Sequence, residues 1–386
     1  MVIYYICCQI VKIMKPIDNI ISKILLQLLK LALDTHSEQR SITLPSSIAW
    51  EEVYRLSAAQ GVMAIVWEAV EILIAEGVLT EERGNMPHKS LRLQWAYSVE
   101  TLKKRYRKQR SVIVKLADIY RSNEIEIMIL KGYGLSLCYP TPEARACSDI
   151  DIWLFGRQQQ ADDILRQRLG VEIDEDKHHH TVFRIDGVMV ENHYDFLNIH
   201  AHLSNRDIER ELKAKSSEAI AIDVEGRKVF IPNANCHALF LLRHAAAHFA
   251  AAEIVLRHIT DWAMFVKRYH ADIDWQWLRG IAREQNMELF LDAINALAVE
   301  VCGIGIELMP GTVRRPELER RIFGDIISPE FSETKPERGL LSIVWYKYRR
   351  WWANRWKHRL VYREGLLHTF LVQVRSHLLK PKSITE

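Results

Sequence analysis

The sequence lacks closely paired cysteines of the C-x-x-C kind. Its six cysteines are Cys7, Cys8, Cys138, Cys147, Cys236 and Cys302, and among these the first two alone are close neighbours. Disulfide frameworks and zinc-binding modules need cysteines at defined short spacings. We therefore expect free thiols in a reducing compartment, and the sequence predicts no zinc framework.

The sequence also lacks a strong net charge. Its 52 Lys and Arg and 49 Asp and Glu residues leave a formal charge of +3 over 386 residues, so overall charge identifies no class of partner. The apolar fraction of 48% and the charged fraction of 26% are ordinary for a globular protein. A chain of this length accommodates two or three domains with a sizeable core.

The apolar N-terminus lacks the features of a membrane anchor or a secretory signal. Residues 1–14 are too few to span a bilayer, and they have neither a basic first segment nor a small-residue cleavage site. An amphipathic helical pattern begins after Met14, so we expect Met14 to be the true start. The alternative interpretation of residues 1–14 is a membrane-peripheral anchor.

Two aspartates lie in an otherwise apolar run that continues to Leu154. Asp149 and Asp151 alternate with Ile150 and Ile152. On a strand, residues i and i+2 point to the same face, so the two carboxylates would repel each other and raise each other's pKa. A divalent cation is the usual remedy, and Mg²⁺ binds through one or two carboxylates plus substrate phosphates. The spacing predicts a metal-dependent phosphoryl-transfer site.

The segments around these aspartates support the same interpretation. Residues 124–130 are predicted to form a strand, Lys131 and Gly132 a turn, and residues 135–139 a short helix whose N-terminus favours anions. Further on, Asp186-Gly187 separates residues 181–185 from 188–193, a pattern typical of a β-hairpin. Glu191 therefore lies on a strand and is the expected third carboxylate.

At these residues the chain resembles the DNA polymerase beta-like nucleotidyltransferase superfamily. The shared pattern is a glycine turn that opens a helix, then two acidic residues alternating on a strand, then a third on a later strand. The Lys131-Gly132 turn and Arg145 ahead of the acidic pair are most similar to an uncharacterised bacterial nucleotidyltransferase family, many of whose members are encoded near polysaccharide-synthesis genes. In this chain Tyr133 follows the glycine, and Asn192-His193 follow Glu191.

The resemblance implies an α+β fold, with a nucleotidyltransferase-type mixed sheet flanked by helical regions. We expect an N-terminal helical region at 1–122, the nucleotidyltransferase core at 123–234 and a C-terminal helical region at 235–386. Asp149, Asp151 and Glu191 would be the catalytic and metal-binding residues, with two Mg²⁺ ions or Mn²⁺ as the alternative ion. Lys131, Gly132, Arg145 and Ser148 would bind the nucleotide.

The function implied is transfer of a nucleoside monophosphate from a nucleoside triphosphate such as ATP. The acceptor is an unidentified small molecule, glycan or protein, with a link to polysaccharide biosynthesis. Nucleic acid is not an expected partner, and the expected location is the cytoplasm. The competing interpretation is a non-catalytic nucleotide-binding or adaptor protein that retains the fold.

Two histidine groups and the C-terminal segment leave alternatives open. His244 and His248 share a helix face, either as structural hydrogen-bonding groups or as the lining of a nucleotide cleft. His178, His179 and His180 are expected in a solvated loop. Residues 345–359 interleave aromatic and basic side chains, and we expect Trp351, Trp352 and Trp356 to be buried. The alternatives for this helix are contact with an anionic membrane surface and stacking on nucleic acid.

Overall fold

The computed structural model of the protein describes residues 19–34, 42–251, 253–336 and 339–379. The expectations for residues 1–14 lie outside the described residues. The described cysteines are free thiols, as predicted: Cys138, Cys147, Cys236 and Cys302.

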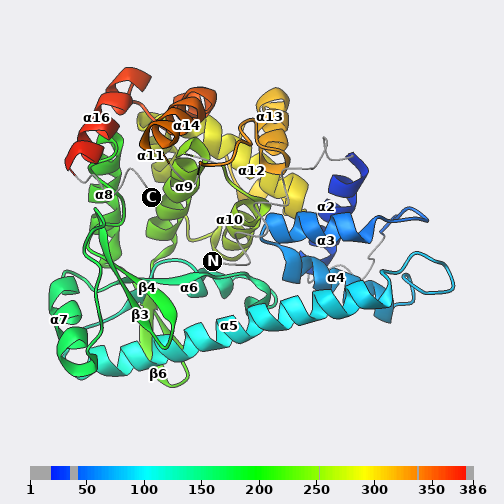
Figure 1. Ribbon diagram of the computed structural model, residues 1–386, viewed down its shortest axis with the longest axis horizontal. Coiled ribbons are helices and arrows are strands. Elements are labelled where there is room, and N and C mark those ends of the chain that lie inside the picture. Colours follow the sequence, from blue (N-terminus) through cyan, green and yellow to red (C-terminus); the bar gives the residue numbers. More distant parts are fainter. Residues whose placement is uncertain (1–18, 35–41, 252, 337–338, 380–386) are drawn as a thin grey trace.

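The chain combines helices with one mixed sheet, which confirms the predicted α+β class (Figure 1). Before the sheet come α2 (Asn19–Leu33), α3 (Trp50–Ala59), α4 (Met63–Ala75) and α5 (Lys89–Arg121). The strands are β1 (Met128–Ile129), β2 (Asp149–Trp153), β3 (His180–Ile185), β4 (Val188–His193), β5 (Ile220–Val224) and β6 (Arg227–Ile231). Between the strands lie α6 (Tyr133–Ser136), η2 (Pro142–Ala144), α7 (Gln158–Leu169) and α8 (Leu203–Ser216).

Helices make up the rest of the described chain. They are α9 (Ala234–Ala251), α10 (Leu256–Tyr269), α11 (Trp275–Glu284), α12 (Glu288–Cys302), η3 (Ile306–Leu308), α13 (Pro316–Ile327), α14 (Leu340–Ala353), α15 (Arg355–Val361) and α16 (Leu366–Leu379). In the described part of the chain, no helix combines the length and apolar character needed to cross a membrane. The domain boundaries at 122 and 234 stay a prediction.

The six-stranded sheet has the order β3-β4-β2-β1-β6-β5. β2 runs parallel to β4 and antiparallel to β1, while β3–β4 and β5–β6 are antiparallel hairpins. The predicted turn of the first hairpin is confirmed, with φ of 51° at Asp186 and 77° at Gly187. Positive φ at both central residues is what a tight two-residue hairpin turn requires.

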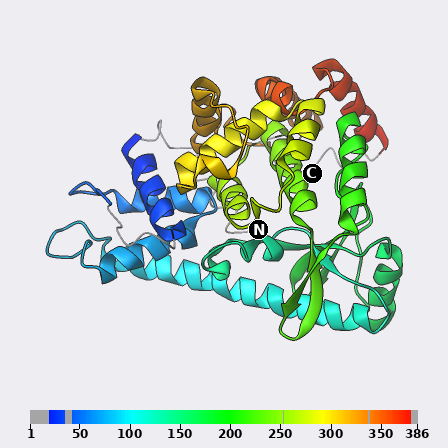
Figure 2. The same ribbon diagram turned by 180° about the vertical axis from the view of Figure 1, so that it is seen from behind.

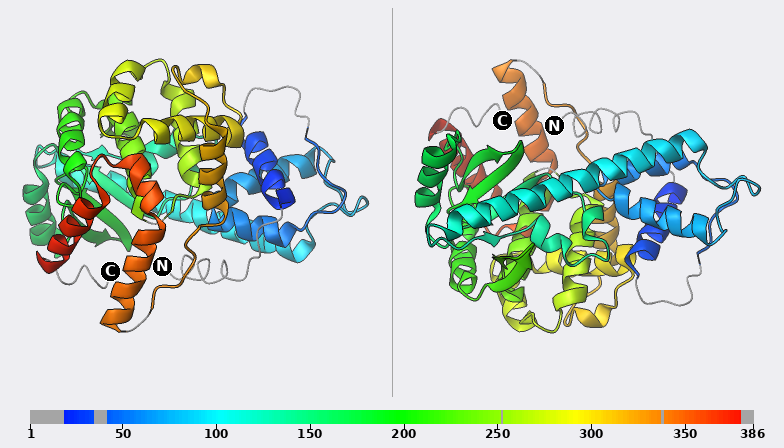
Figure 3. Two further views of the ribbon diagram at one scale, coloured as in Figure 1. Left: turned by 90° about the horizontal axis from the view of Figure 1, so that it is seen from above. Right: turned by 90° about the horizontal axis from the view of Figure 1, so that it is seen from below.

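One face of the sheet packs on the long helix α5, which contacts β2, β4, β5 and β6 (Figures 1 and 3). Val112, Ile113 and Leu116 of α5 share a buried cluster with Ile150 and Ile152 of β2. Because side chains alternate along a strand, this packing turns Asp149 and Asp151 toward the opposite face. The helices α8–α12 lie on that opposite side, as the view from behind also shows (Figure 2).

The aromatic residues at the edge of that opposite face connect the sheet to α9. Trp153 of β2 stacks on Phe196 with ring centroids 4.2 Å apart. Phe196 in turn makes an edge contact with Phe240 of α9 at 5.9 Å. The polar residues of β2 and β4 therefore lie between the sheet and a second, helical layer.

Two elements are shorter than the sequence predicted. The strand expected at 124–130 comprises Met128–Ile129 alone, because Glu124 adopts a positive φ of 57° directly after the turn that ends α5. The helix expected at 135–139 is a single turn, Tyr133–Ser136. One turn is too short for a substantial helix dipole, so the anion-binding argument from a helix N-terminus does not hold here.

The expected burial of the C-terminal tryptophans is wrong for Trp352, whose exposed fraction is 51%. Trp351 and Trp356 are half-buried. Helix α14 projects from the helical layer (Figure 3), and Leu341, Trp345 and Trp352 along it are exposed.

Candidate active site at the polar face of the sheet

The strand register brings two of the three predicted carboxylates side by side. In the parallel β2–β4 ladder, Asp151 is paired with Glu191, and Asp149 with Met189. Paired residues on adjacent strands project to the same face, and Asp149 lies two residues before Asp151. The three carboxylates therefore share one face of two adjacent strands, with Asp151 fully buried and Asp149 and Glu191 half-buried.

Two histidines that the sequence analysis did not assign to the site lie in the same group. His193 Nε2 is 3.2 Å from Asp151 Oδ1 and 3.5 Å from Glu191 Oε2. His180 is paired with His193 across the hairpin, and its Nε2 is 3.9 Å from Glu191 Oε2. The expected solvated loop is therefore wrong for His180, which is buried on β3. A signal was present: His193 is two residues after Glu191, and the hairpin spacing pairs it with His180.

The turn between β1 and α6 places Lys131 at the carboxylates. Lys131 Nζ forms an ion pair of 3.0 Å with Asp151 Oδ1 and is 3.3 Å from His244 Nε2. Gly132 has φ 58° and ψ −107°, a conformation for which side chains other than hydrogen are strained. The glycine thus allows the chain to turn sharply, and this turn aims Lys131 at the site.

The pKa values of the two aspartates move in opposite directions. Burial alone would raise the pKa of Asp151, but Lys131 and the hydrogen bond with His193 outweigh it and hold that pKa well below its usual range. Burial, and then repulsion by Asp151, raise the pKa of Asp149 above its ordinary value. The charge of Asp151 is thus compensated by positive charge within the protein, whereas at Asp149 the charge of Lys131 is outweighed by burial and repulsion.

The pKa values of the two site histidines, His193 and His180, also move in opposite directions. Burial alone would lower the pKa of His193, but hydrogen bonds with Asp151 and Glu191 raise it to about 9. Burial lowers the pKa of His180 to about 4, so its ring is neutral at pH 7. Near pH 7 without a metal ion, His193 and Lys131 are the two cations that face the three carboxylates.

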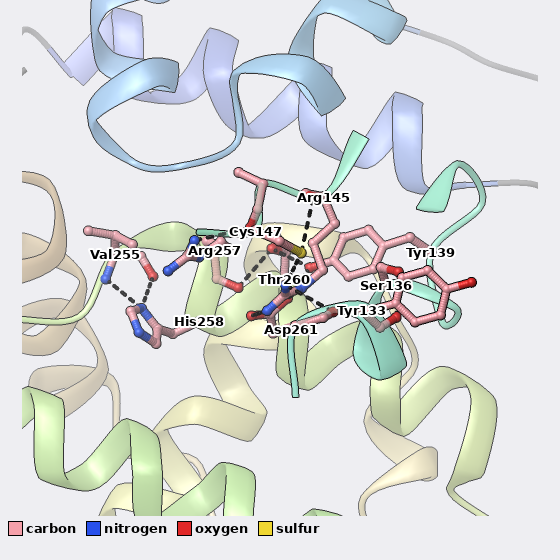
Figure 4. A network of polar contacts seen from close by, with 12 residues as sticks. Tyr133, Ser136, Tyr139, Arg145, Cys147, Val255, Arg257, His258, Thr260 and Asp261 are labelled. Carbon is pink, nitrogen blue, oxygen red and sulfur yellow. Dashed lines mark hydrogen bonds and ion pairs between the residues drawn. The ribbon is translucent and has the colours of Figure 1, made fainter. Parts of the chain in front are cut away.

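Ser148 and Arg145 have different positions relative to this group. Ser148 donates a hydrogen bond to Asp149 Oδ1 at 2.9 Å, which orients that carboxylate. Arg145 forms a two-point ion pair with Asp261 of α10, at 2.7 Å from Nε and 2.8 Å from Nη2 (Figure 4). Its remaining nitrogen donates to the carbonyl of Gly132 at 3.2 Å. Arg145 therefore holds the glycine turn, which differs from the nucleotide-binding role that the family resemblance implied.

Helix α10 therefore fixes the loops that carry the site. Tyr139 donates to Asp261 Oδ1 at 2.6 Å, and Arg257, one turn before Asp261, donates to the carbonyl of Ala146 at 3.1 Å (Figure 4). Arg145 is buried with Asp261, and Arg145 lowers the pKa of that carboxyl although burial alone would raise it. The loop from Gly132 to Ser148 is thus anchored from the helical layer.

His244 and His248 are on α9, and they lie beside Lys131 of the glycine turn. Their Nε2 atoms are 3.2 Å apart, and His244 also contacts the Lys131 ammonium group. Burial, and then the charge of Lys131, lower the pKa of both rings. These contacts place the two histidines at the rim of the polar face, and whether they also line a nucleotide cleft stays a prediction.

Two other carboxylates of this region, one in the hairpin turn and one just after the hairpin, lie away from the site. Asp186 is at the exposed turn, where Lys115 of α5 contacts it at 3.2 Å. The Asp195 side chain pairs with Lys213 of α8. Neither carboxylate approaches Asp151 in the way that Glu191 does.

The residues at this face fit a divalent metal ion. Ligand atoms of Asp151, Glu191 and His193 all lie within 4.8 Å of one another. Asp151 Oδ2 is fully buried and has no hydrogen-bond partner. A buried carboxylate oxygen without a partner is costly, and a coordinated cation would relieve that cost. Asp149 is not part of this close group and lies at its more accessible end.

Comparisons with known proteins give one family and one solved structure. A family model described as "Uncharacterised nucleotidyltransferase" matches residues 46–303, which is more than half of the chain. None of the curated proteins matches the chain. The chain is similar to a crystal structure of an antigenic nucleotidyltransferase-like protein from Paracoccidioides brasiliensis, at 14% identity and a TM-score of 0.32, over 50% of this chain and 92% of that chain. A likeness this weak carries no conclusion about the site.

Proposed function

The chain belongs to the uncharacterised nucleotidyltransferase family, and on that basis we propose that it is a Mg²⁺-dependent enzyme that transfers a nucleoside monophosphate from a nucleoside triphosphate to an acceptor hydroxyl or phosphate. The observation that carries this proposal is the pairing of Asp151 with Glu191 on adjacent strands, with Asp149 on the same face. Three carboxylates beside a lysine-bearing turn are what metal-assisted phosphoryl transfer needs.

Asp149 and Asp151 would hold the metal ions. Bound there, Mg²⁺ would supply charge neutralisation and polarisation of the α-phosphorus. Asp151 offers its buried Oδ2, and Asp149 faces the more accessible end where a triphosphate enters. The raised pKa of Asp149 fits a carboxylate whose charge is balanced when cation and nucleotide arrive together.

Lys131 would contact the triphosphate. Its ammonium group lies 3.0 Å from Asp151 on a turn kept open by Gly132, so it adjoins the position of the metal. Phosphate oxygens would replace part of its contact with Asp151. Ser148 keeps Asp149 oriented through its hydrogen bond at 2.9 Å.

Glu191 would act on the acceptor side. It is half-buried and lies beside Asp151, so a metal ion held between the two carboxylates would be next to the acceptor oxygen. The acceptor would be a glycan, small molecule or protein, within polysaccharide biosynthesis. Because the described cysteines are free thiols, we include a cytoplasmic location in the proposal.

The alternative is a non-catalytic nucleotide-binding or adaptor protein with the same fold. Such a protein has no need for three carboxylates on one face, and retaining them costs stability through mutual repulsion. Burial, and then repulsion by Asp151, raise the pKa of Asp149, so this repulsion is part of the cost here. The carboxylate set therefore favours the enzyme.

We expect Glu191→Gln to lower the rate of nucleotidyl transfer by about 10²-fold or more, because amide nitrogen and oxygen cannot accept a proton from the acceptor as a carboxylate does. Nucleotide affinity should change by no more than a few-fold, since Glu191 lies on the acceptor side of the site. The measurement uses α-labelled nucleoside triphosphates with Mg²⁺ and cell extract as the acceptor source, together with equilibrium binding of each triphosphate.

Glu218→Gln is the matched control, because Glu218 is exposed just before β5 and has no part in the site. This variant should retain full transfer. Equal losses of rate and nucleotide affinity in Glu191→Gln would place Glu191 on the nucleotide side. Nucleotide binding by the wild-type protein without labelled product would favour the non-catalytic alternative.

We also propose that α14 contacts an anionic membrane surface. Its exposed apolar side chains follow helical spacing, at Leu341, Trp345, Tyr348 and Trp352. Basic groups flank them: the Arg355 guanidinium lies 4.8 Å from the Trp352 ring, and Arg349 is half exposed. Aromatic side chains beside basic ones are typical of helices at the interface of anionic bilayers.

The membrane proposal predicts co-sedimentation with vesicles that contain phosphatidylserine and none with phosphatidylcholine vesicles. Trp345→Ala with Trp352→Ala should reduce the bound fraction several-fold, because two interfacial rings are lost. Raising the salt concentration should also release the protein, since the basic groups are then screened. Tyr97→Ala removes an exposed aromatic of α5 and should leave binding unchanged. An unchanged vesicle-bound fraction in the variant with both tryptophan substitutions would contradict this role for α14.

A further inference from the structure

The histidines beside the carboxylates bear on which metal ion the site takes, a question that rests on the proposed function. A site that holds Mg²⁺ is built from oxygen ligands and keeps several waters. Here, ligand atoms of His193 lie within 4.8 Å of those of Asp151 and Glu191, and a second group brings His179, His180 and His193 within the same limit. Imidazole nitrogens suit divalent transition-metal ions far better than Mg²⁺.

The His193 ring is oriented as a metal ligand. Its Nδ1 is 3.2 Å from the backbone carbonyl of Asp195. A carbonyl oxygen accepts only, so Nδ1 carries the hydrogen and Nε2 faces Asp151 and Glu191 with its lone pair in the neutral ring. A histidine ligand commonly donates its other N–H to a carbonyl or carboxylate, which fixes the ring and its tautomer.

The spacing of the ligand atoms fits one ion. Bonds of about 2.1 Å place neighbouring ligand atoms about 3.0–3.4 Å apart in octahedral or tetrahedral geometry. His193 Nε2 is 3.2 Å from Asp151 Oδ1 and 3.5 Å from Glu191 Oε2. His180 Nε2 is 3.9 Å from Glu191 Oε2, but His180 does not share the 4.8 Å limit that joins Asp151, Glu191 and His193, so it lies beside this group.

A buried atom without a partner supports the site independently of these distances. Asp151 is fully buried, and its Oδ2 has no hydrogen-bond partner. Such an oxygen costs free energy while it remains unpaired, and a coordinated ion would relieve that cost.

From these observations we infer that Asp151, Glu191 and His193 form a mixed carboxylate–imidazole site that binds a divalent transition-metal ion in preference to Mg²⁺. Two carboxylates and one imidazole suit ions from Mn²⁺ to Zn²⁺. Asp149 and the triphosphate would complete the coordination during transfer. The three-carboxylate site thus has an added imidazole ligand, provided by the end of β4.

The test measures binding of Co²⁺, Zn²⁺ and Mg²⁺ separately by calorimetry, with the full chain and no nucleotide. Visible absorption of bound Co²⁺ reports nitrogen ligation directly. We expect wild-type protein to bind Co²⁺ and Zn²⁺ at least about tenfold more tightly than Mg²⁺. His193→Gln should weaken Co²⁺ and Zn²⁺ by at least about tenfold and change the Co²⁺ spectrum, while Mg²⁺ affinity changes little.

Glu191→Gln is the second variant, and it should also weaken Co²⁺ and Zn²⁺, because it removes another ligand of the group. His200→Gln is the matched control, because His200 is exposed after β4 and outside the group. Thermal unfolding without metal, compared across the variants, shows whether His193→Gln misfolds, and in that case the Co²⁺ affinity of Glu191→Gln tests the inference. Equal affinity for Mg²⁺ and Co²⁺, or unchanged Co²⁺ binding in both variants, would overturn the inference.

The result is separable from the proposed enzymatic function. Tight, His193-dependent Co²⁺ binding by a protein that transfers no nucleotide would support this site and contradict the transferase. Mg²⁺-dependent transfer that His193→Gln leaves intact, with Co²⁺ binding also intact, would support the transferase and overturn the imidazole site.

Discussion

Asp151→Asn is expected to abolish nucleotidyl transfer, with a loss of about three orders of magnitude or more. The carboxylate supplies the buried oxygen that has no partner in the protein, and an amide binds a divalent cation far more weakly. Metal-assisted stabilisation of phosphoryl transfer contributes several kcal/mol, and each 1.36 kcal/mol is tenfold in rate. Asp149→Asn should cause a similar loss, measured with labelled nucleoside triphosphates.

The two variants should differ in stability although they share the loss of activity. Asp151 is paired with Lys131 and His193, so Asp151→Asn leaves buried positive charges unpaired and destabilises the metal-free protein. Asp149 has a raised pKa from burial and repulsion, so Asp149→Asn should be neutral or stabilising. Urea unfolding without metal at pH 7 compares the two. Asp186→Asn, at the exposed hairpin turn, is the control for both measurements.

The pH dependence of stability gives a second measurement of the same difference. The folded-state pKa of Asp151 is lowered, so its ionisation stabilises the protein above the unfolded-state pKa, and this contribution disappears as pH falls toward the folded value. Asp149 has the opposite sign, since its raised pKa means that ionisation destabilises the folded state. Acid should therefore reduce the stability advantage of wild type over Asp151→Asn. If the difference in the free energy of unfolding between wild type and Asp151→Asn increases as pH falls, the pairing of Asp151 with Lys131 and His193 is contradicted.

The part of the site within one hairpin and one strand was predictable from the sequence. Alternation placed Asp149 and Asp151 on one face, and the Asp186-Gly187 turn placed Glu191 on a strand, both from rules that act over a few residues. The same rules also apply to His193 and His180, which follow from the hairpin spacing. His180 was assigned to a solvated loop because a run of three histidines has the composition of one, and burial is not a local property.

The remaining features depend on contacts between distant segments. Arg145 and Asp261 are 116 positions apart, and the sequence alone does not indicate that they meet. The positive charge of Arg145 beside an acidic motif suggested phosphate binding, whereas the structure gives that charge to a buried carboxylate. Similarly, the helical pattern of α14 is the same whether its aromatic side faces protein or another surface, so burial of Trp352 could not be decided from the pattern.

The Arg145–Asp261 pair also makes the positions of the site residues depend on the helical layer. Arg145 holds the carbonyl of Gly132, and Gly132 adjoins Lys131, which contacts Asp151. A change at Asp261 of α10 would thus alter the positions of the carboxylates through Arg145 and the Lys131-Gly132 turn. Replacement of Asp261 should therefore affect both stability and transfer.

Arg145→Ala and Asp261→Ala are each expected to lower the free energy of unfolding by about 3–5 kcal/mol, because each leaves a fully buried charge without its partner. Both members are buried, and the pair forms two hydrogen bonds of 2.7 and 2.8 Å. Urea unfolding measures the loss.

The double variant should lose less than the sum of the two single losses, by about 0.5–3 kcal/mol, because neither charge remains unpaired. Arg210→Ala breaks an exposed ion pair of 2.8 Å with Asp207 and should cost no more than about 1 kcal/mol. Strictly additive losses in the double variant would show that the two residues act separately, and the glycine turn would then need another anchor.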